Sequence, residues 1–240
     1  MSEALSSILA GARVVDMTYP LTAEFPLYPV YDPVRVAEKF SCANDGFFVK
    51  SWAFDEHSGT HVDAPAHFGE GQATVDQIAP EELILPVAMI DISDRVGHDH
   101  DATVTPDDVV DWERRHGPLP ERCAVFVLTG WGSRAHDPAA YLNADAGGTM
   151  HSPGFGAELT EFLKDERPGV RAIGLDTASL DIGASADFPA HVSWLPSGRY
   201  GIENLANLDA LPPLGAVAIV GAPRLAGGSG GPTRVLALVS

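Results

Sequence analysis

Residues 56–68 read Glu-His-Ser-Gly-Thr-His-Val-Asp-Ala-Pro-Ala-His-Phe and carry the most informative chemistry in the chain. Within them lie His57, His61, Asp63 and His67, although the whole chain has only nine histidines among 240 residues. Imidazole and carboxylate groups together are typical ligands of Zn²⁺, Mn²⁺ or iron. Burying four such side chains without a partner would be costly. The stretch therefore predicts a metal site.

The local conformation of this stretch is predicted to be a turn followed by a strand. His57 and His61 are four residues apart, a spacing that would place both on one face of a helix. Gly59 and the neighbouring β-branched residues disfavour a helix. In a strand, His61 and Asp63 point to the same face. A turn at Ser58 and Gly59 then brings His57 back toward them.

Outside this stretch, the sequence mixes many short strands with two helices. The expected strands, which are apolar or β-branched runs, cover 13–17, 47–54, 83–92, 123–129, 170–175, 216–220 and 235–239. Thr105 followed by Pro106 predicts a helix start, and this helix ends at His116. Apolar spacing predicts a second helix over 156–167. Strands outnumber helices without strict alternation, so we expect a single mixed-sheet α/β domain spanning residues 1–240.

The charge of the chain excludes several classes of partner. With 15 Lys+Arg against 33 Asp+Glu, the formal net charge is −18, which disfavours nucleic acid and anionic membranes as partners.

No apolar run is long enough to span a membrane, and no secretory signal is evident. The two cysteines, Cys42 and Cys123, do not form a disulfide framework. We expect a cytoplasmic protein.

The stretch 57–68 resembles the signature of the cyclase family of metal-dependent hydrolases, which includes kynurenine formamidases and isatin hydrolases. Further segments of the chain are similar to other motifs of this family. They are 16–21, 26–29, 174–181, 203–208, 211–212 and 230–234, together with His191. The region 95–160 is not distinctive. The resemblance implies a swivelling β/β/α fold and assembly into a homodimer or homotetramer.

The resemblance also implies roles for particular residues. The first metal ion would be held by His57, His61 and Asp63. In relatives with two metals, Asp63 would bridge to a second ion held by His191 and Glu203. His67 matches the histidine assigned to acid–base catalysis. One departure is the sequence after His191, Val-Ser-Trp-Leu, where relatives commonly have a leucine pair.

The chemistry implied is hydrolysis of a C–N bond in a small amide, either an aryl formamide or a cyclic amide such as isatin or a lactam. A bound metal ion lowers the pKa of water and polarises a carbonyl, and His67 could carry the proton. No serine stands in a nucleophile elbow. For the metal ion of this site, Zn²⁺ is favoured over Mn²⁺. One alternative function is a cyclase, lyase or dehydratase that uses the same metal ion. Another is a metal-binding protein without turnover.

Two residues near the motifs have open roles. Glu56 either orients a ligand imidazole or is an exposed acid at the end of a strand. Trp194 is the aromatic residue favoured for stacking on a substrate. The other aromatic residues near the motifs are expected to pack in the core, and they are Phe47, Phe48, Trp52 and Phe68.

Overall fold

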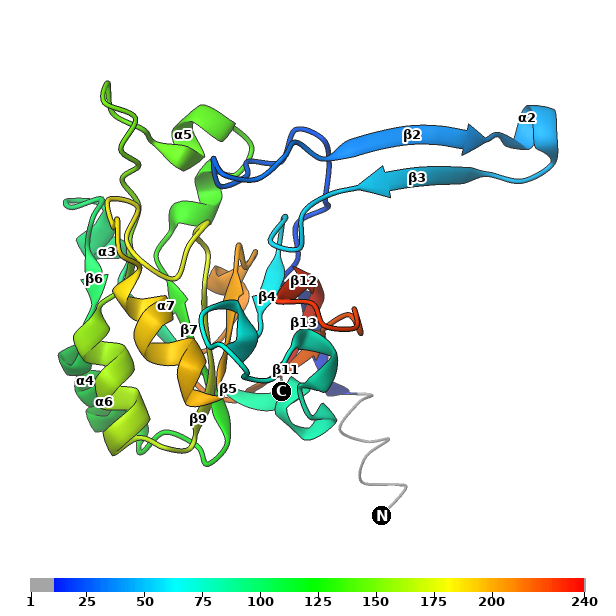
Figure 1. Cartoon of the computed structure of the whole chain (residues 1–240). Helices are drawn as coiled ribbons and strands as arrows, with labels where there is room; N and C mark the ends of the chain where they lie inside the picture. The colour runs from blue at the N-terminus through cyan, green and yellow to red at the C-terminus, as the bar shows by residue number, and fades with distance from the viewer. Residues whose placement is uncertain (1–10, 240) are drawn as a thin grey trace, which may run out of the picture.

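The computed structural model describes residues 11–239, and its central feature is a nine-stranded mixed sheet (Figure 1). The strand order across the sheet is β1-β13-β11-β5-β7-β9-β10-β4-β12. The bounds are β1 Arg13–Asp16, β4 His61–Asp63, β5 Ile84–Asp91, β7 Cys123–Leu128, β9 Val170–Leu175, β10 Tyr200–Glu203, β11 Ala216–Gly221, β12 Gly230–Pro232 and β13 Arg234–Val239. The four strands from β5 to β10 pair in parallel, and the pairs on either side are antiparallel.

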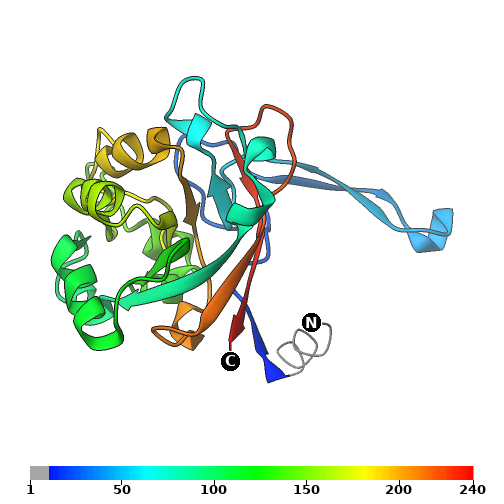
Figure 2. The ribbon, with the colours of Figure 1, turned by 90° about the horizontal axis from the view of Figure 1, so that it is seen from below.

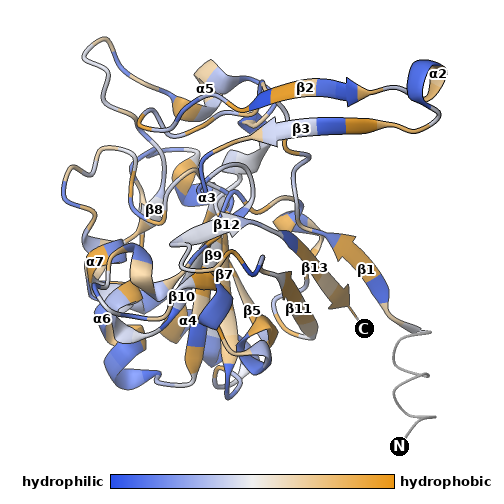
Figure 3. Cartoon of the chain, turned by 45° about the vertical axis from the view of Figure 1, so that its right-hand side comes forward, coloured by the Kyte–Doolittle hydropathy of each residue, from blue (hydrophilic) through white to orange (hydrophobic). Residues whose placement is uncertain are grey.

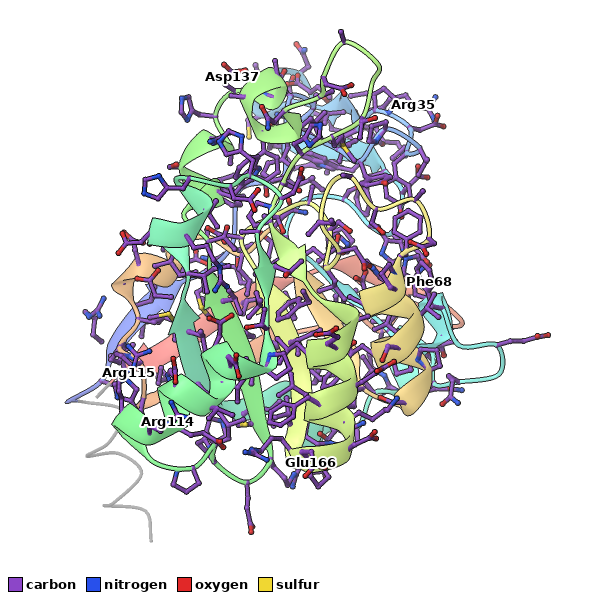
Figure 4. The ribbon with its side chains drawn as sticks, turned by 90° about the vertical axis from the view of Figure 1, so that its left-hand side faces the viewer. Arg35, Phe68, Arg114, Arg115, Asp137 and Glu166 are labelled. Atoms are coloured by element: carbon purple, nitrogen blue, oxygen red, sulfur yellow. The ribbon has the colours of Figure 1, made fainter. Side chains whose placement is uncertain are left out.

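Helices cover one face of the parallel strands. Figure 4 looks onto this face, where Arg114 and Arg115 mark the end of α4 and Glu166 the end of α6. The helices are α3 Ser93–Val96, α4 Pro106–His116, α5 Pro138–Leu142, α6 Ala157–Glu166 and α7 Pro189–Trp194. A small parallel pair, β6 Thr103–Val104 with β8 Gly154–Phe155, lies beside them. None of the helices in residues 11–239 is long and apolar enough to cross a bilayer.

The parallel strands carry apolar side chains on both faces because both faces are covered. On β7, Val125 and Val127 pack in the core beneath the helices, whereas Ala124 and Phe126 pack in the core on the opposite face. This alternation follows from the two-residue period of a strand. The two cores hold β9, β10 and β4 in a fixed register. This register positions His61 and Asp63 on β4 and Glu203 on β10.

The expected mixed-sheet α/β fold is confirmed. Each expected strand overlaps an observed strand, and the helix predicted to end at His116 covers Pro106–His116. Its start is a capping box, in which the Thr105 backbone N–H donates to Asp108 at 2.8 Å. The short strands β4, β10 and β12 lie side by side at one edge of the sheet, where β10 also pairs with β9, and only β4 was expected.

A two-stranded arm stands apart from the main sheet. It consists of β2 Arg35–Phe40, the short helix α2 Cys42–Asp45 at its tip, and β3 Val49–Ala53. Figures 1 and 2 both show it extending away from the body of the molecule. The prediction that Phe47, Phe48 and Trp52 pack in the core is wrong, because their exposed fractions are 50%, 55% and 45%. The strand expected over residues 47–54 is present as β3, but none of the residues of β3 is buried.

Candidate metal centre

Strand pairing brings together the predicted ligands that lie on strands. In the antiparallel pair of β4 with β10, Glu203 lies opposite His61, and their Oε2 and Nε2 atoms are 3.3 Å apart. Asp63 lies opposite Gly230 on the other neighbouring strand, β12. A Cβ atom on Gly230 would lie 2.7 Å from the His57 ring. Glycine at this position therefore lets the strand and the imidazole approach each other.

His57 reaches the same point from the turn that precedes β4, as predicted. Gly59 has a φ of +65°, in the left-handed region that favours glycine. The turn brings Nδ1 of His57 to 2.7 Å from Oδ1 of Asp63, and Nε2 of His61 lies 3.2 Å from the same oxygen. All three side chains are buried. The local prediction of a turn followed by a strand is therefore correct.

His191 comes from a separate element, the helix α7, which packs on the face of the sheet opposite to Val62 and Ile202. Asp181 accepts hydrogen bonds from the backbone N–H of Ala190 at 2.6 Å and of His191 at 3.2 Å. Asp181 also lies 2.6 Å from Nδ1 of His191, so one carboxylate both caps the helix and orients the ring. Nε2 of His191 is thereby placed 3.5 Å from Asp63 and 3.2 Å from Glu203. The sequence alone does not indicate this role of Asp181.

Glu56 orients His57 through a serine. Ser229 lies in the glycine-rich loop before β12, and it donates to Glu56 through its hydroxyl at 2.6 Å and its backbone N–H at 2.8 Å. The Ser229 oxygen lies 3.0 Å from Nε2 of His57. Since the hydroxyl proton points to Glu56, the serine oxygen accepts from the imidazole. Of the two roles left open for Glu56, the structure supports the orienting one.

These contacts fix which nitrogen of each imidazole faces inward. Nδ1 of His61 lies 2.8 Å from the Gly59 carbonyl, which only accepts hydrogen bonds, so Nδ1 carries the proton. By the same argument, His191 is protonated on Nδ1, against Asp181. His57 has acceptors at both ring nitrogens, Ser229 at Nε2 and, at 2.7 Å from Nδ1, Asp63. The inward nitrogens of all three rings therefore face carboxylate oxygens, which only accept, so a proton or a metal ion must lie between each nitrogen and its carboxylate. An acceptor facing an acceptor needs a cation between them.

Burial sharpens this requirement. Nε2 of His61 and Oδ2 of Asp63 are buried and have no hydrogen-bond partner. Burial lowers the pKa of His61, but Asp63 and Glu203 outweigh it and raise that pKa to about 10. Burial likewise opposes ionisation of Asp63, yet the surrounding histidines hold its pKa well below its usual range. Positive charge is thus strongly favoured here, and protons or divalent ions could supply it.

The structure brings together all five predicted ligands. Among residues 11–239, two groups of three acidic or histidine side chains have ligand atoms within 4.8 Å of one another. One is His57, His61 and Asp63, and the other is Asp63, His191 and Glu203. Two ion positions sharing Asp63 is the arrangement that the resemblance implied. Their assignment as ligands stays a prediction, supported by a donor set and geometry that fit a divalent ion.

The contact of Ser229 with His57 leads to a prediction about metal affinity. Ser229→Ala removes the acceptor for the outward N–H of His57, so the ring loses its fixed tautomer and orientation. We expect the affinity for added Zn²⁺ or Mn²⁺ to fall about 10- to 100-fold. Competition with a chromophoric chelator measures this change directly.

The matched control is Ser197→Ala, which removes a partly buried hydroxyl that bonds to Trp194 away from the metal ligands. It should leave metal affinity unchanged. If Ser229→Ala binds metal as tightly as the unmodified chain, the orienting role of Glu56 and Ser229 is wrong.

His67 lies beside the predicted ligands without joining either group. It follows Pro65 in a short 3-10 turn, Pro65–His67, and its ring stacks on that of His57 with centroids 3.9 Å apart. Burial lowers the pKa of His67 to about 4, against the opposing charge of Asp63. The ring is therefore neutral at pH 7. A neutral imidazole next to the metal position can accept a proton.

A cavity of about 230 Å³ opens onto these side chains. One side of the cavity is formed by His67 and by four of the predicted metal ligands, which are His57, Asp63, His191 and Glu203. The remaining lining is largely aromatic and comprises Tyr28, Val30, Tyr31, Phe68, Ala178, Ser179 and Phe188.

One sequence-based expectation about these aromatic residues is wrong, and another is incomplete. Trp194 has no exposed surface and donates its ring N–H to the Tyr200 carbonyl at 2.9 Å, so it supports the core and does not line the cavity. Phe68 packs against the core beneath the helices, as expected, but it also lines the cavity, and its ring lies 4.8 Å from that of His191. Figure 4 labels Phe68 beside α7.

The cavity wall also includes residues that the sequence analysis did not single out as site residues. Tyr31 stacks on His57, with ring centroids 5.8 Å apart and planes at 19°. Phe188 has a φ of 50° at the start of α7, and its ring contacts those of Tyr28 and Phe68. No spacing in the sequence links these rings to the histidine stretch. Their approach depends on the fold.

Comparison with known proteins identifies relatives of this chain that are hydrolases. The Cyclase family model matches residues 15–182. An isatin hydrolase from Roseibium aggregatum is 38% identical over 205 residues, covering 82% of this chain and 77% of the relative. A kynurenine formamidase from Geobacillus thermodenitrificans is 28% identical over 204 residues, covering 83% and 84%.

Solved structures agree with the sequence matches. Isatin hydrolase A from Ralstonia solanacearum superimposes with a TM-score of 0.94 at 36% identity, covering 100% of this chain and 97% of that one. An isatin hydrolase bound to the product analogue thioisatinate superimposes with a TM-score of 0.92 at 33% identity, covering 99% and 97%. The matched family model, the paired ligand groups and the shared fold together establish that the chain belongs to the Cyclase family.

Proposed function

We propose that this chain is a metal-dependent hydrolase that opens the C–N bond of a small aromatic amide, with a cyclic amide of the isatin kind as its substrate. The observation that carries the proposal is the inward-facing set of three imidazoles and two carboxylates beside a partly buried, neutral His67. Similarity to isatin hydrolases exceeds similarity to the kynurenine formamidases compared, which favours a ring amide over a linear formamide.

The ligand set would hold one or two divalent ions. Such an ion, when bound, supplies Lewis-acid polarisation of the amide carbonyl and acidifies water. The nitrogen-rich set favours Zn²⁺ over Mn²⁺ in intrinsic affinity. His57, His61 and Asp63 would form the first position, and His191 with Glu203 would complete the second by sharing Asp63.

His67 would carry the proton in this reaction. Hydrolysis adds water across the C–N bond, giving a carboxylic acid and an amine. Neutral His67 would take a proton from the attacking water and deliver it to the departing nitrogen. Among the described residues, no partner occupies its ring nitrogens at hydrogen-bond distance, and it lines the cavity. Its ring nitrogens are therefore available to a water molecule or a substrate in the cavity.

The cavity supports an aromatic substrate. Tyr31, Phe68 and Phe188 present ring surfaces within a space of about 230 Å³, which suits a small planar molecule.

The two cysteines are free, and Cys42 is exposed, which suits a reducing compartment and supports a cytoplasmic location.

A turnover assay tests this function. Chain loaded separately with Zn²⁺ and Mn²⁺ is incubated with isatin, N-formylkynurenine and a simple lactam, while absorbance, acid release and product mass are followed. We expect isatin to be consumed with release of acid and a product heavier by one water. A product of unchanged mass would instead indicate a cyclase or lyase. Metal binding without consumption of any of the three would favour a protein without turnover.

A further inference from the structure

One buried hydroxyl group on the cavity wall, that of Ser179, belongs neither to the predicted ligands nor to the proton path. Three of the residues that line the cavity carry a hydroxyl group, and they are Tyr28, Tyr31 and Ser179. Only Ser179 is buried, with 5% of its surface exposed. It lies in the loop that follows β9, the strand that pairs with β10 in the body of the molecule (Figure 3).

The hydroxyl proton of Ser179 has no acceptor within the described part of the chain. The hydroxyl oxygen accepts the backbone N–H of Asp181 at 3.2 Å. This bond uses a lone pair of the oxygen and leaves the proton free, and among residues 11–239 the hydroxyl donates no hydrogen bond. Buried polar groups in folded proteins are nearly always hydrogen-bonded. A free buried donor on a cavity wall therefore points to an acceptor on the molecule that the cavity binds.

The two residues after Ser179 hold predicted metal ligands. The backbone N–H of Leu180 donates to Oε1 of Glu203 at 2.8 Å, and Asp181 lies against the ring of His191. These contacts fix the position of the serine relative to the second ligand group before a substrate binds. A donor that is held in place in this way needs no reorganisation when negative charge develops beside it.

Ser179 suits contact with a developing negative charge better than the other polar groups of the cavity. Tyr28 and Tyr31 are only partly buried, so water competes for their hydroxyl groups. His67 has to accept a proton in the proposed reaction. The residues that line the cavity include no lysine or arginine, so no fixed cationic side chain performs this task there. A buried neutral donor is also stronger than an exposed one, because water is excluded around it.

We propose that Ser179 is an oxyanion donor, whose hydroxyl donates a hydrogen bond to the carbonyl oxygen of the amide. This role rests on the proposed function. When water adds to the carbonyl carbon, a C–O bond forms and the π electron pair moves to the carbonyl oxygen. The hydrogen bond from Ser179 strengthens on this oxyanion, while the serine keeps its proton. The pair then returns to the C=O bond, the C–N bond breaks, and the nitrogen leaves with the proton that His67 delivers.

The first test compares kinetic constants of the Zn²⁺-loaded chain and its Ser179→Ala variant on an amide that the unmodified chain consumes. We expect kcat to fall about 10- to 100-fold while KM changes less than about threefold, because the hydrogen bond is strongest in the transition state. Elemental analysis should find the same metal content in both proteins. Ser179→Thr keeps a hydroxyl group and should recover most of the lost rate.

The matched control is Ser152→Ala, which removes another buried serine hydroxyl, one that lies outside the cavity. It should leave kcat and KM unchanged. A folded Ser179→Ala variant with the full kcat would overturn the donor role. If this variant instead loses metal together with activity, Ser179 acts by positioning Asp181, and the donor role is equally wrong.

The second test needs no turnover, so it separates failure of the donor role from failure of the proposed function. Isothermal titration calorimetry measures how the Zn²⁺-loaded chain binds phenylglyoxylate, an aromatic keto acid whose carboxylate resembles the product of opening a ring amide. We expect Ser179→Ala to raise the Kd about 10-fold and Ser152→Ala to leave it unchanged. This loss would support the donor role even if no amide were consumed. Equal Kd values for the unmodified chain and Ser179→Ala, or no binding by the unmodified chain, would overturn it even if isatin is hydrolysed.

Discussion

Replacing His67 with alanine is expected to lower kcat for amide hydrolysis about 10²- to 10⁴-fold, the usual contribution of a general acid–base group. The reason is that His67 is the neutral imidazole that lines the cavity and belongs to neither ligand group. For the same reason, the variant should retain its full metal content. Initial rates on a confirmed substrate and elemental analysis of the same preparation give the two numbers needed.

The control for His67→Ala is His151→Ala, which removes a histidine paired with Asp101 at 2.6 Å outside the cavity. It should change neither rate nor metal content. If His67→Ala keeps its full rate, the proton-carrying role is wrong. If the variant loses metal together with activity, His67 is a ligand and not a proton carrier.

The first ligand group could be predicted because its geometry is local. His57, His61 and Asp63 lie within seven residues, and a turn followed by a strand suffices to bring them together. Glu203 is different, since it reaches His61 only through the pairing of β4 with β10 across most of the chain. Spacing along the sequence contains no information about that register. Only family resemblance placed Glu203 and His191 in the site.

The residues that orient the predicted ligands were missed for the same physical reason. Asp181 acts on His191 by capping α7, and Ser229 reaches His57 from a loop 172 positions away in sequence. An aspartate or a serine in a loop has many possible partners. The sequence signal for Asp181 was its position ten residues before His191, which becomes meaningful only when α7 is known to start at Pro189.

The errors with aromatic residues arise because burial depends on what covers a strand. Phe48 and Trp52 form part of a correctly predicted strand, but that strand belongs to a projecting arm. Trp194 lies three residues after a predicted ligand, yet α7 turns its ring inward to the Tyr200 carbonyl. Phe68 and Trp194 both lie close in sequence to predicted site residues, yet only Phe68 lines the cavity. Proximity in sequence therefore does not distinguish a cavity side chain from a core side chain.

The second large effect is expected for Asp63→Asn, which should lose all bound metal and reduce hydrolysis to background. Asp63 belongs to both ligand groups, is fully buried, and lies within 3.5 Å of His57, His61 and His191. The amide keeps the volume of the carboxylate but removes its negative charge, which the two ion positions would share. We expect affinity for Zn²⁺ or Mn²⁺ to fall by more than about 100-fold, measured by chelator competition.

Comparison with Glu203→Gln makes the result specific to a shared carboxylate. Glu203 belongs only to the second group, so its amide variant should keep the metal held by His57, His61 and Asp63. Elemental analysis should then find no metal in Asp63→Asn and the first ion still present in Glu203→Gln. If Glu203→Gln also loses all metal, the five side chains form one mononuclear site. A folded Asp63→Asn variant with full metal content would show that Asp63 orients the histidines without bridging ions.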